Sequence, residues 1–293
     1  GAIPQDVTRS NNYLGHSNWA DGATYGIGVT LLYSTALSAN QIATANTELG
    51  RTISTATLTI GTNNATSSFA GSIKDGNAAV ALIKQGTGTL TLTSANSYAG
   101  GTTISGGILQ AGIASTGSVI NGPFGKGVVT VNSGYTLDLN GFNIANAITL
   151  NGAGVGNNGA LINSSATAAT ASGAMTIASN SSIGGSGAIT ISGAISASAN
   201  TISFVNNPSI TATNTANSIA SVTITGSSVT LKTAASLTVN ASSLTGASTL
   251  QTVAAGKDIT ISGAITNNTN ANTFTLMASR DILVSATISG ATG

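Results

Sequence analysis

The chain is dominated by a short alternation in which a threonine stands between two apolar residues. The pattern recurs at residues 57–60, 128–131, 189–191, 222–224, 229–231, 237–239 and 259–261. Successive side chains of a strand point to opposite faces, so each segment predicts a short strand with one apolar face. The pairs Asn121-Gly122, Asn140-Gly141 and Asn151-Gly152 lie between such segments and predict turns with positive φ.

Strands this short bury little apolar surface alone, so they must stack. Parallel rungs spaced about 4.8 Å apart would give a continuous core. With roughly 20–25 residues per coil, residues 51–293 are predicted to form about ten rungs. The predicted fold class is therefore all-β, a parallel β-solenoid.

Residues 1–50 differ from the rest and are predicted to form a small amino-terminal cap or docking module. Between Ser38, a candidate N-cap, and Gly50, a candidate stop, apolar residues recur at helical intervals. The module also holds His16, the single histidine, and most of the large aromatic residues: Tyr13, Trp19, Tyr25 and Tyr33.

Composition narrows the function. Only 5% of the residues are charged against 41% hydrophobic, and the net charge is +1 with the charges scattered singly. No basic patch is present to hold phosphates, which argues against nucleic-acid binding. No run approaches the roughly 18 apolar residues of a membrane-spanning helix. Cysteine is absent, which excludes disulfides and thiolate metal sites.

Catalysis is not expected. Glycoside cleavage needs two carboxylates about 5–10 Å apart, and the chain has seven acidic residues, most of them isolated in sequence. Asp258 and Asp281 lie 23 residues apart, about one coil, and follow Lys257 and Arg280. We interpret them as a repeated turn that pairs Asp with a cation of the neighbouring rung. His16 has no second histidine to share a metal. No catalytic, cofactor-binding or metal-binding residue is predicted.

Residues 84–112 (KQGTGTLTLTSANSYAGGTTISGGILQAG) closely resemble the autotransporter-associated β-strand repeat. Residues 129–141 and 159–165 resemble the coils that follow it, and residues 255–262 and 274–282 resemble coils of filamentous haemagglutinins. The resemblance implies a right-handed parallel β-helix on the outside of a bacterium. It fits either a fragment of a larger passenger or a smaller protein that uses the same rungs. The start at Gly1-Ala2-Ile3-Pro4 is interpreted as following a removed secretion signal or as excision from a longer chain.

The end of a solenoid exposes an unpaired rung that can template another chain. The last residues contain no helix pattern, charge cluster or proline that would cap them. Either further rungs continue beyond Gly293, or this end docks onto the amino-terminal module of the next copy and builds a filament. We favour the filament. The predicted interface comprises Ile3, Val7, Tyr13, Trp19, Tyr25, Tyr33, Ile282, Val284 and Ile288.

The favoured prediction is thus a non-catalytic extracellular protein whose partner is itself, head to tail. One alternative is the passenger of a surface adhesin that binds glycans or host matrix. A remote alternative is a glycan-active β-helix enzyme, which would require a carboxylate pair in a groove lined by aromatic residues.

Overall fold

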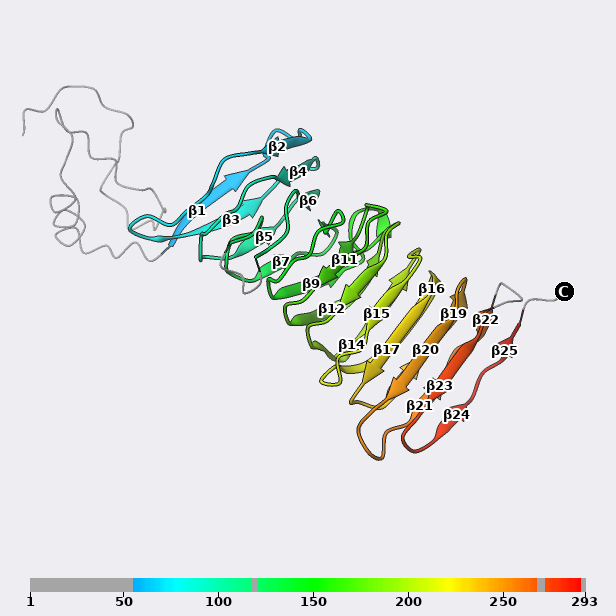
Figure 1. The fold of residues 1–293 in the computed structure, drawn as a ribbon. Coiled ribbons are helices and arrows are strands. Elements are labelled where there is room, and N and C mark those ends of the chain that lie inside the picture. Colours follow the sequence, from blue (N-terminus) through cyan, green and yellow to red (C-terminus); the bar gives the residue numbers. More distant parts are fainter. Residues whose placement is uncertain (1–54, 117–120, 268–271, 291–293) are drawn as a thin grey trace, which may run out of the picture. The chain divides into compact units, whose positions relative to one another are not determined.

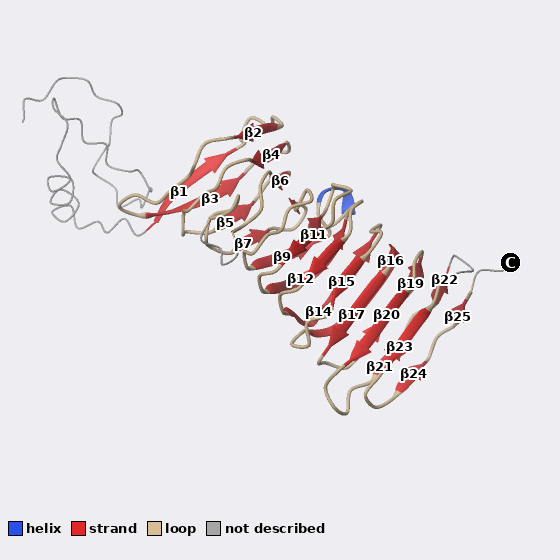
Figure 2. Cartoon of the chain, viewed as in Figure 1, coloured by secondary structure: helices blue, strands red, loops and turns tan. Residues whose placement is uncertain are grey.

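The computed structural model describes residues 55–116, 121–267 and 272–290. Figures 1 and 2 show strands lying side by side as successive rungs from β1 to β25, joined by turns. Every strand pairing in this part of the chain is parallel. Its one helical element is the short 3-10 helix η1 (Val155–Asn157). The predicted all-β parallel solenoid is confirmed.

Two columns of stacked strands form the first half of the solenoid. The first column is β1 (Thr55–Ile60), β3 (Ala79–Lys84), β5 (Thr102–Ile104), β7 (Val129–Val131) and β9 (Ile148–Gly152). The second column is β2 (Ser67–Phe69), β4 (Thr89–Leu92), β6 (Ile108–Ala111), β8 (Thr136–Asp138) and β10 (Leu161–Ile162).

Three long strands then run across both columns, each pairing at its start with one column and at its end with the other. These are β12 (Met175–Gly184), β14 (Ile195–Val205) and β16 (Ser218–Ser227). Beyond β16 the rung divides again into two short strands. The resulting stacks are β18 (Leu237–Val239), β21 (Ile259–Ile261) and β24 (Ile282–Val284), and β19 (Ser242–Leu244), β22 (Ile265–Asn267) and β25 (Ile288–Ser289).

A separate sheet forms the third side of the later coils. Its strands are β11 (Ala169–Ala171), β13 (Ile189–Ile191), β15 (Ile210–Ala212), β17 (Val229–Thr233), β20 (Ser248–Thr252) and β23 (Phe274–Met277). Paired residues on adjacent rungs are 17 to 28 residues apart, from Ser221↔Thr238 to Ile108↔Thr136. The described residues thus make about ten coils, as predicted.

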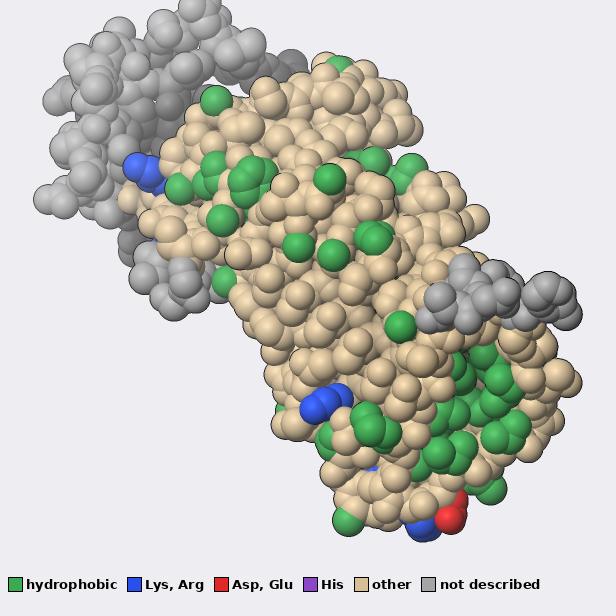
Figure 3. Space-filling model, turned by 45° about the vertical axis from the view of Figure 1, so that its right-hand side comes forward, with side chains coloured by type: hydrophobic (Ala, Val, Ile, Leu, Met, Phe, Trp, Pro, Cys, Tyr) green, Lys and Arg blue, Asp and Glu red, His purple; other side chains and the backbone are tan. Residues whose placement is uncertain are grey.

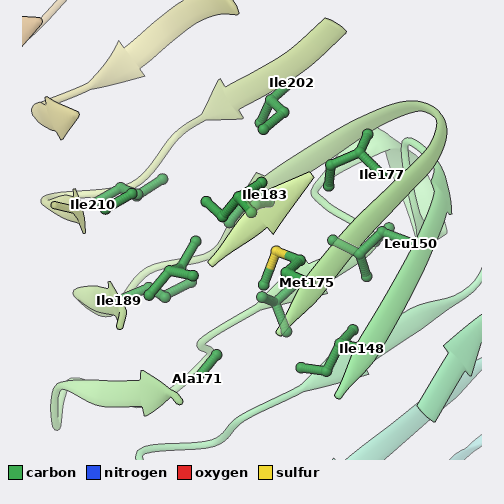
Figure 4. Packing of buried hydrophobic residues seen from close by; sticks show 14 of the residues in the cluster. Ile148, Leu150, Ala171, Met175, Ile177, Ile183, Ile189, Ile202 and Ile210 are labelled. Atoms are coloured by element: carbon green, nitrogen blue, oxygen red, sulfur yellow. The ribbon is translucent and has the colours of Figure 1, made fainter. Parts of the chain in front are cut away.

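The core lies between the sheets and is filled by the apolar residues of the alternating pattern. In β13, Ile189 and Ile191 are buried while Thr190 between them is exposed. Figure 4 shows Ile148, Met175 and Ala171 pointing into the shared interior from two different sheets. The threonines instead form outward columns, one of which stays in register over six rungs: Thr170, Thr190, Thr211, Thr230, Thr249 and Thr275.

The turn predictions hold at two of three places. Asn140 and Gly141 both have positive φ, 48° and 80°, and Gly152 has φ 77°. The prediction for Asn121-Gly122 is wrong, since neither residue has positive φ. Gly122 instead forms an isolated antiparallel bridge with Asn96 of an adjacent coil, so this segment is held by backbone pairing.

The predicted amino-terminal module, residues 1–50 with its helix at 38–50, lies outside the described residues. Among the residues that are described, no helix has the length and apolar character needed to cross a membrane.

Candidate docking surface

The final described rung, formed by β24 and β25 and called the end rung here, leaves its core positions open. Three apolar side chains are roughly half exposed: Ile282 at 46%, Val284 at 55% and Ile288 at 47%. Their register partners on the preceding rung are at most 1% exposed: Ile259, Ile261 and Ile265. The same strand position is therefore buried where a further rung covers it and open where none does. Figure 3 shows hydrophobic side chains gathered at this end of the solenoid.

The end rung is also an open sheet edge. Within the described ranges, β24 pairs only with β21, and β25 only with β22. An open edge of this kind presents backbone donors and acceptors to an incoming strand. Leu283, 50% exposed, lies on the opposite face of β24, in register with Thr260. It distinguishes the outer face of the strand from the inner face formed by Ile282 and Val284.

The turn that opens the end rung carries an ion-pair ladder. Arg280 reaches back across one rung, donating from Nε to Oδ1 of Asp258 at 2.7 Å and from its terminal nitrogen to Oδ2. The backbone N–H of Asp281 adds a hydrogen bond to Oδ1 of Asp258 at 3.2 Å. Chiefly through the Arg280 hydrogen bond, the pKa of Asp258 is held below its usual range. This confirms the repeated turn expected from the sequence at Asp258 and Asp281.

Among the predicted interface residues, the structure brings Ile282, Val284 and Ile288 together on one exposed face. The others lie outside the described residues: Ile3, Val7, Tyr13, Trp19, Tyr25 and Tyr33. Sequence reasoning missed Asp281 as part of this surface, although the basic–acidic pair repeated after 23 residues was its signal.

The remaining described acidic side chains hold the backbone in place. Asp75 accepts N–H bonds from Val80 at 2.7 Å and Ala99 at 3.1 Å. Asp138 is buried, and its Oδ2 accepts from Gln110 at 2.8 Å and from Ser164 at 2.6 Å. Across residues 55–116, 121–267 and 272–290, no three His, Cys, Asp or Glu side chains gather as metal ligands would. Each of these two carboxylates fixes a turn or bridges two rungs.

A shallow depression on the first column shows the same lack of reactive groups. It is lined by Ala99, Gly100, Gly101, Thr102, Thr103, Gly127, Val128 and Thr130. The lining contains no acidic, basic or aromatic side chain, so it offers neither a proton donor nor a stacking platform for a sugar ring.

Comparison with known proteins agrees with this architecture. Residues 82–111 match the passenger-associated transport repeat family. The chain is also 37% identical over 122 residues to the "Adhesin BmaC autotransporter" of Brucella suis biovar 1 (strain 1330). The chain carries a passenger-type β-repeat. The adhesin match takes in 40% of this chain and 3% of the adhesin, so the chain spans only a small part of that relative's length. No solved structure matches the chain significantly.

The passenger repeat covers β4, β5 and β6 and the last part of β3. Its inward residues are fully or almost fully buried: Leu82, Leu90, Leu92, Tyr98, Ile104 and Leu109. Its glycines lie where coils approach closely, since a Cβ on Gly86 would stand 1.8 Å from the carbonyl oxygen of Gly61. The repeat is therefore a structural unit whose conspicuous residues serve packing.

Proposed function

We propose that this chain is a non-catalytic β-solenoid of a bacterial surface whose end rung receives the amino-terminal part of a second copy. The passenger repeat and the similarity to an autotransporter adhesin support the surface location. The carboxylates of Asp258, Asp138 and Asp75 are each engaged in holding turns or joining rungs, which supports a scaffold role.

The exposure of the end rung carries the proposal. Three inward positions are 46–55% exposed, whereas their partners one rung earlier are buried. Fully burying one Val or Ile side chain is worth about 1.5–3 kcal/mol relative to leaving it in water. A strand added to this edge would cover all three and also satisfy the open backbone groups.

The second copy supplies a different surface from the one it covers, so the contact is head to tail. Such a contact does not close on itself and produces a filament. In this proposal the amino-terminal residues Ile3 and Val7 and the aromatic residues Tyr13, Trp19, Tyr25 and Tyr33 belong to the covering partner. Tyr and Trp are enriched at protein interfaces.

Two variants of adjacent residues test the proposal. Val284→Thr removes an inward methyl surface, and Leu283→Thr makes a matched change on the outer face of the same strand. Purified protein is followed by light scattering and electron microscopy, with circular dichroism as the folding control. We expect filaments from the wild type and from Leu283→Thr, and monomers from Val284→Thr. Deleting residues 1–10 should also abolish assembly and leave the β-rich spectrum intact.

Filaments from Val284→Thr equal to those of the wild type would overturn docking at the end rung. A wild-type chain that stays monomeric at all concentrations would overturn self-assembly itself. The similarity to an adhesin favours a second function, binding to glycans or host matrix. Binding of the monomer to immobilised glycans and matrix proteins would support that function, and absence of binding would count against it.

A further inference from the structure

The residues that open the last three rungs form a column along the solenoid. Ser236, Asp258 and Asp281 directly precede β18, β21 and β24. The side-chain oxygen of each accepts the backbone N–H of the next: Asp258 N–H donates to Oγ of Ser236 and Asp281 N–H to Oδ1 of Asp258, both at 3.2 Å. The geometry repeats from rung to rung and ends, in the described chain, at the carboxylate of Asp281.

The backbone repeats alongside the side chains. Leu237 N–H donates to the carbonyl oxygen of Asp258 at 2.9 Å, and Ile259 N–H to that of Asp281 at 3.0 Å. A rung added next would therefore place its own residue over Asp281, with its N–H directed at the Asp281 carboxylate. Ile282 N–H would donate to that residue's carbonyl oxygen. The register of an incoming strand is thus defined by the existing ladder.

The ladder also defines the charge of the incoming strand. Asp258 binds the guanidinium of Arg280, which comes from the rung that covers it and precedes Asp281 by one residue. The Asp258 side chain is 14% exposed, whereas that of Asp281 is 66% exposed. The nearest cation to Asp281 is its own neighbour Arg280, with Nε at 3.4 Å from Oδ2, and that guanidinium is already bonded to Asp258.

We propose that Asp281 binds a cation of the second copy and so selects the strand that covers the end rung. This inference rests on the head-to-tail docking proposed above and names its charge contact. In the rungs described, the cation stands two residues before the first inward apolar residue: Lys257 before Ile259, and Arg280 before Ile282. The required strand therefore reads basic, any residue, apolar.

The amino-terminal part of the second copy provides one such segment. Residues 1–54 contain two cations, Arg9 and Arg51. Arg51 is followed two residues later by Ile53, whereas Arg9 is followed at that distance by Asn11. The pattern thus assigns Arg51 as the partner of Asp281, immediately before the first described strand of the solenoid.

A charge exchange in the full-length chain tests the pair. The measured quantity is the critical concentration for filament formation of the wild type, Asp281→Arg, Arg51→Asp and the double variant, at low and high salt. Each single reversal should raise it roughly tenfold, and the double variant should return it to near the wild-type value. The differences should shrink in 1 M salt, where the Debye length is about 3 Å.

Three further variants make the outcome specific. Asp281→Asn should show a smaller rise than Asp281→Arg, because it removes attraction without adding repulsion. Arg9→Asp combined with Asp281→Arg should show no rescue, and rescue there would overturn the assignment to Arg51. Lys232→Glu reverses a charge away from the end rung and should leave the critical concentration unchanged. Circular dichroism shows whether each variant is folded.

The outcomes separate this inference from the proposed function. If filaments form and Asp281→Arg leaves the critical concentration unchanged, the charge contact is wrong and docking at the end rung stands. If single reversals weaken assembly and the double variant shows no recovery, the pairing of Asp281 with Arg51 is overturned. If the wild type forms no filament, both fall together.

Discussion

The Lys84 ammonium group donates a hydrogen bond to the backbone carbonyl oxygen of Gly106, 3.1 Å away on the following rung. The side chain is 1% exposed and also donates to the carbonyl oxygens of Gln85 and Gly86, at 2.8 and 2.9 Å. Burial lowers the pKa of this amine. A lysine thus occupies a core position of the passenger repeat because three carbonyl groups accept its protons.

Replacing this lysine by an apolar residue of similar length should weaken the fold. Lys84→Met leaves three carbonyl groups without their donor, and we expect the free energy of unfolding to fall by about 1–3 kcal/mol. Urea unfolding measures the change. Lys126→Met, at an exposed lysine, is the control and should stay within about 0.5 kcal/mol of the wild type. Equal stability of the two variants would contradict a structural role for Lys84.

Close approach of successive coils makes one glycine irreplaceable by alanine. A Cβ on Gly193 would lie 1.9 Å from the carbonyl oxygen of Gly173 on the preceding coil. We expect Gly193→Ala to destabilise the protein by about 1–3 kcal/mol, since the two backbones must separate. Gly76→Ala, where no atom lies within 4 Å, should have little effect. Thermal melting compares the two, and a melting temperature of Gly193→Ala at the wild-type value would refute the steric argument.

The buried carboxylate of Asp138 should matter more than the exposed one of Asp75. Asp138 accepts four hydrogen bonds, including those from the backbone N–H groups of Asn140 and Ser164 at 2.9 and 3.0 Å. Asp138→Ala leaves these donors buried, and we expect a loss of about 2–3 kcal/mol in unfolding free energy. Asp75→Ala should cost less, because water replaces the lost acceptor there. Chemical denaturation decides, and a larger loss for Asp75→Ala would count against the prediction.

The Asp258–Arg280 pair predicts how the end rung responds to acid. The pKa of Asp258 is lower in the folded protein than in the unfolded chain. Its contribution to stability is therefore fully present above the unfolded value of about 3.9 and is lost as pH falls through the folded pKa. We expect the NMR titration of the Asp258 carboxyl carbon to fall below that of an unstructured aspartate. In Arg280→Gln the midpoint should move up to the ordinary value, and an unchanged midpoint would show that Arg280 is not the cause.

The alternating segments were predictable because a strand with one buried face obeys a period of two. Ile259, Thr260 and Ile261 illustrate this, with the threonine outside and both isoleucines inside. The basic–acidic pairs at 257–258 and 280–281 were predictable because their spacing matches one coil.

The polar interior was less accessible from sequence. Lys84 follows the inward phase of Leu82, yet an isolated cation at a core position is explained only by carbonyl groups from its own turn and from the next coil. Likewise, β12 passes through the polar run Ser179-Asn180-Ser181-Ser182. Its strand conformation comes from pairing with β9, β10 and β14 and not from an apolar alternation.

The threonine column of the third sheet has a consequence for how such proteins change length. Because Thr170, Thr190 and Thr211 occupy equivalent places on consecutive coils, each coil meets its neighbours through the same backbone register. Excising one whole coil would bring two matching edges together, whereas losing one residue from a strand would turn its inward side chains outward. Duplication and loss of genetic segments can therefore adjust the reach of this surface protein in steps of one coil, while single-codon deletions within strands are eliminated by selection.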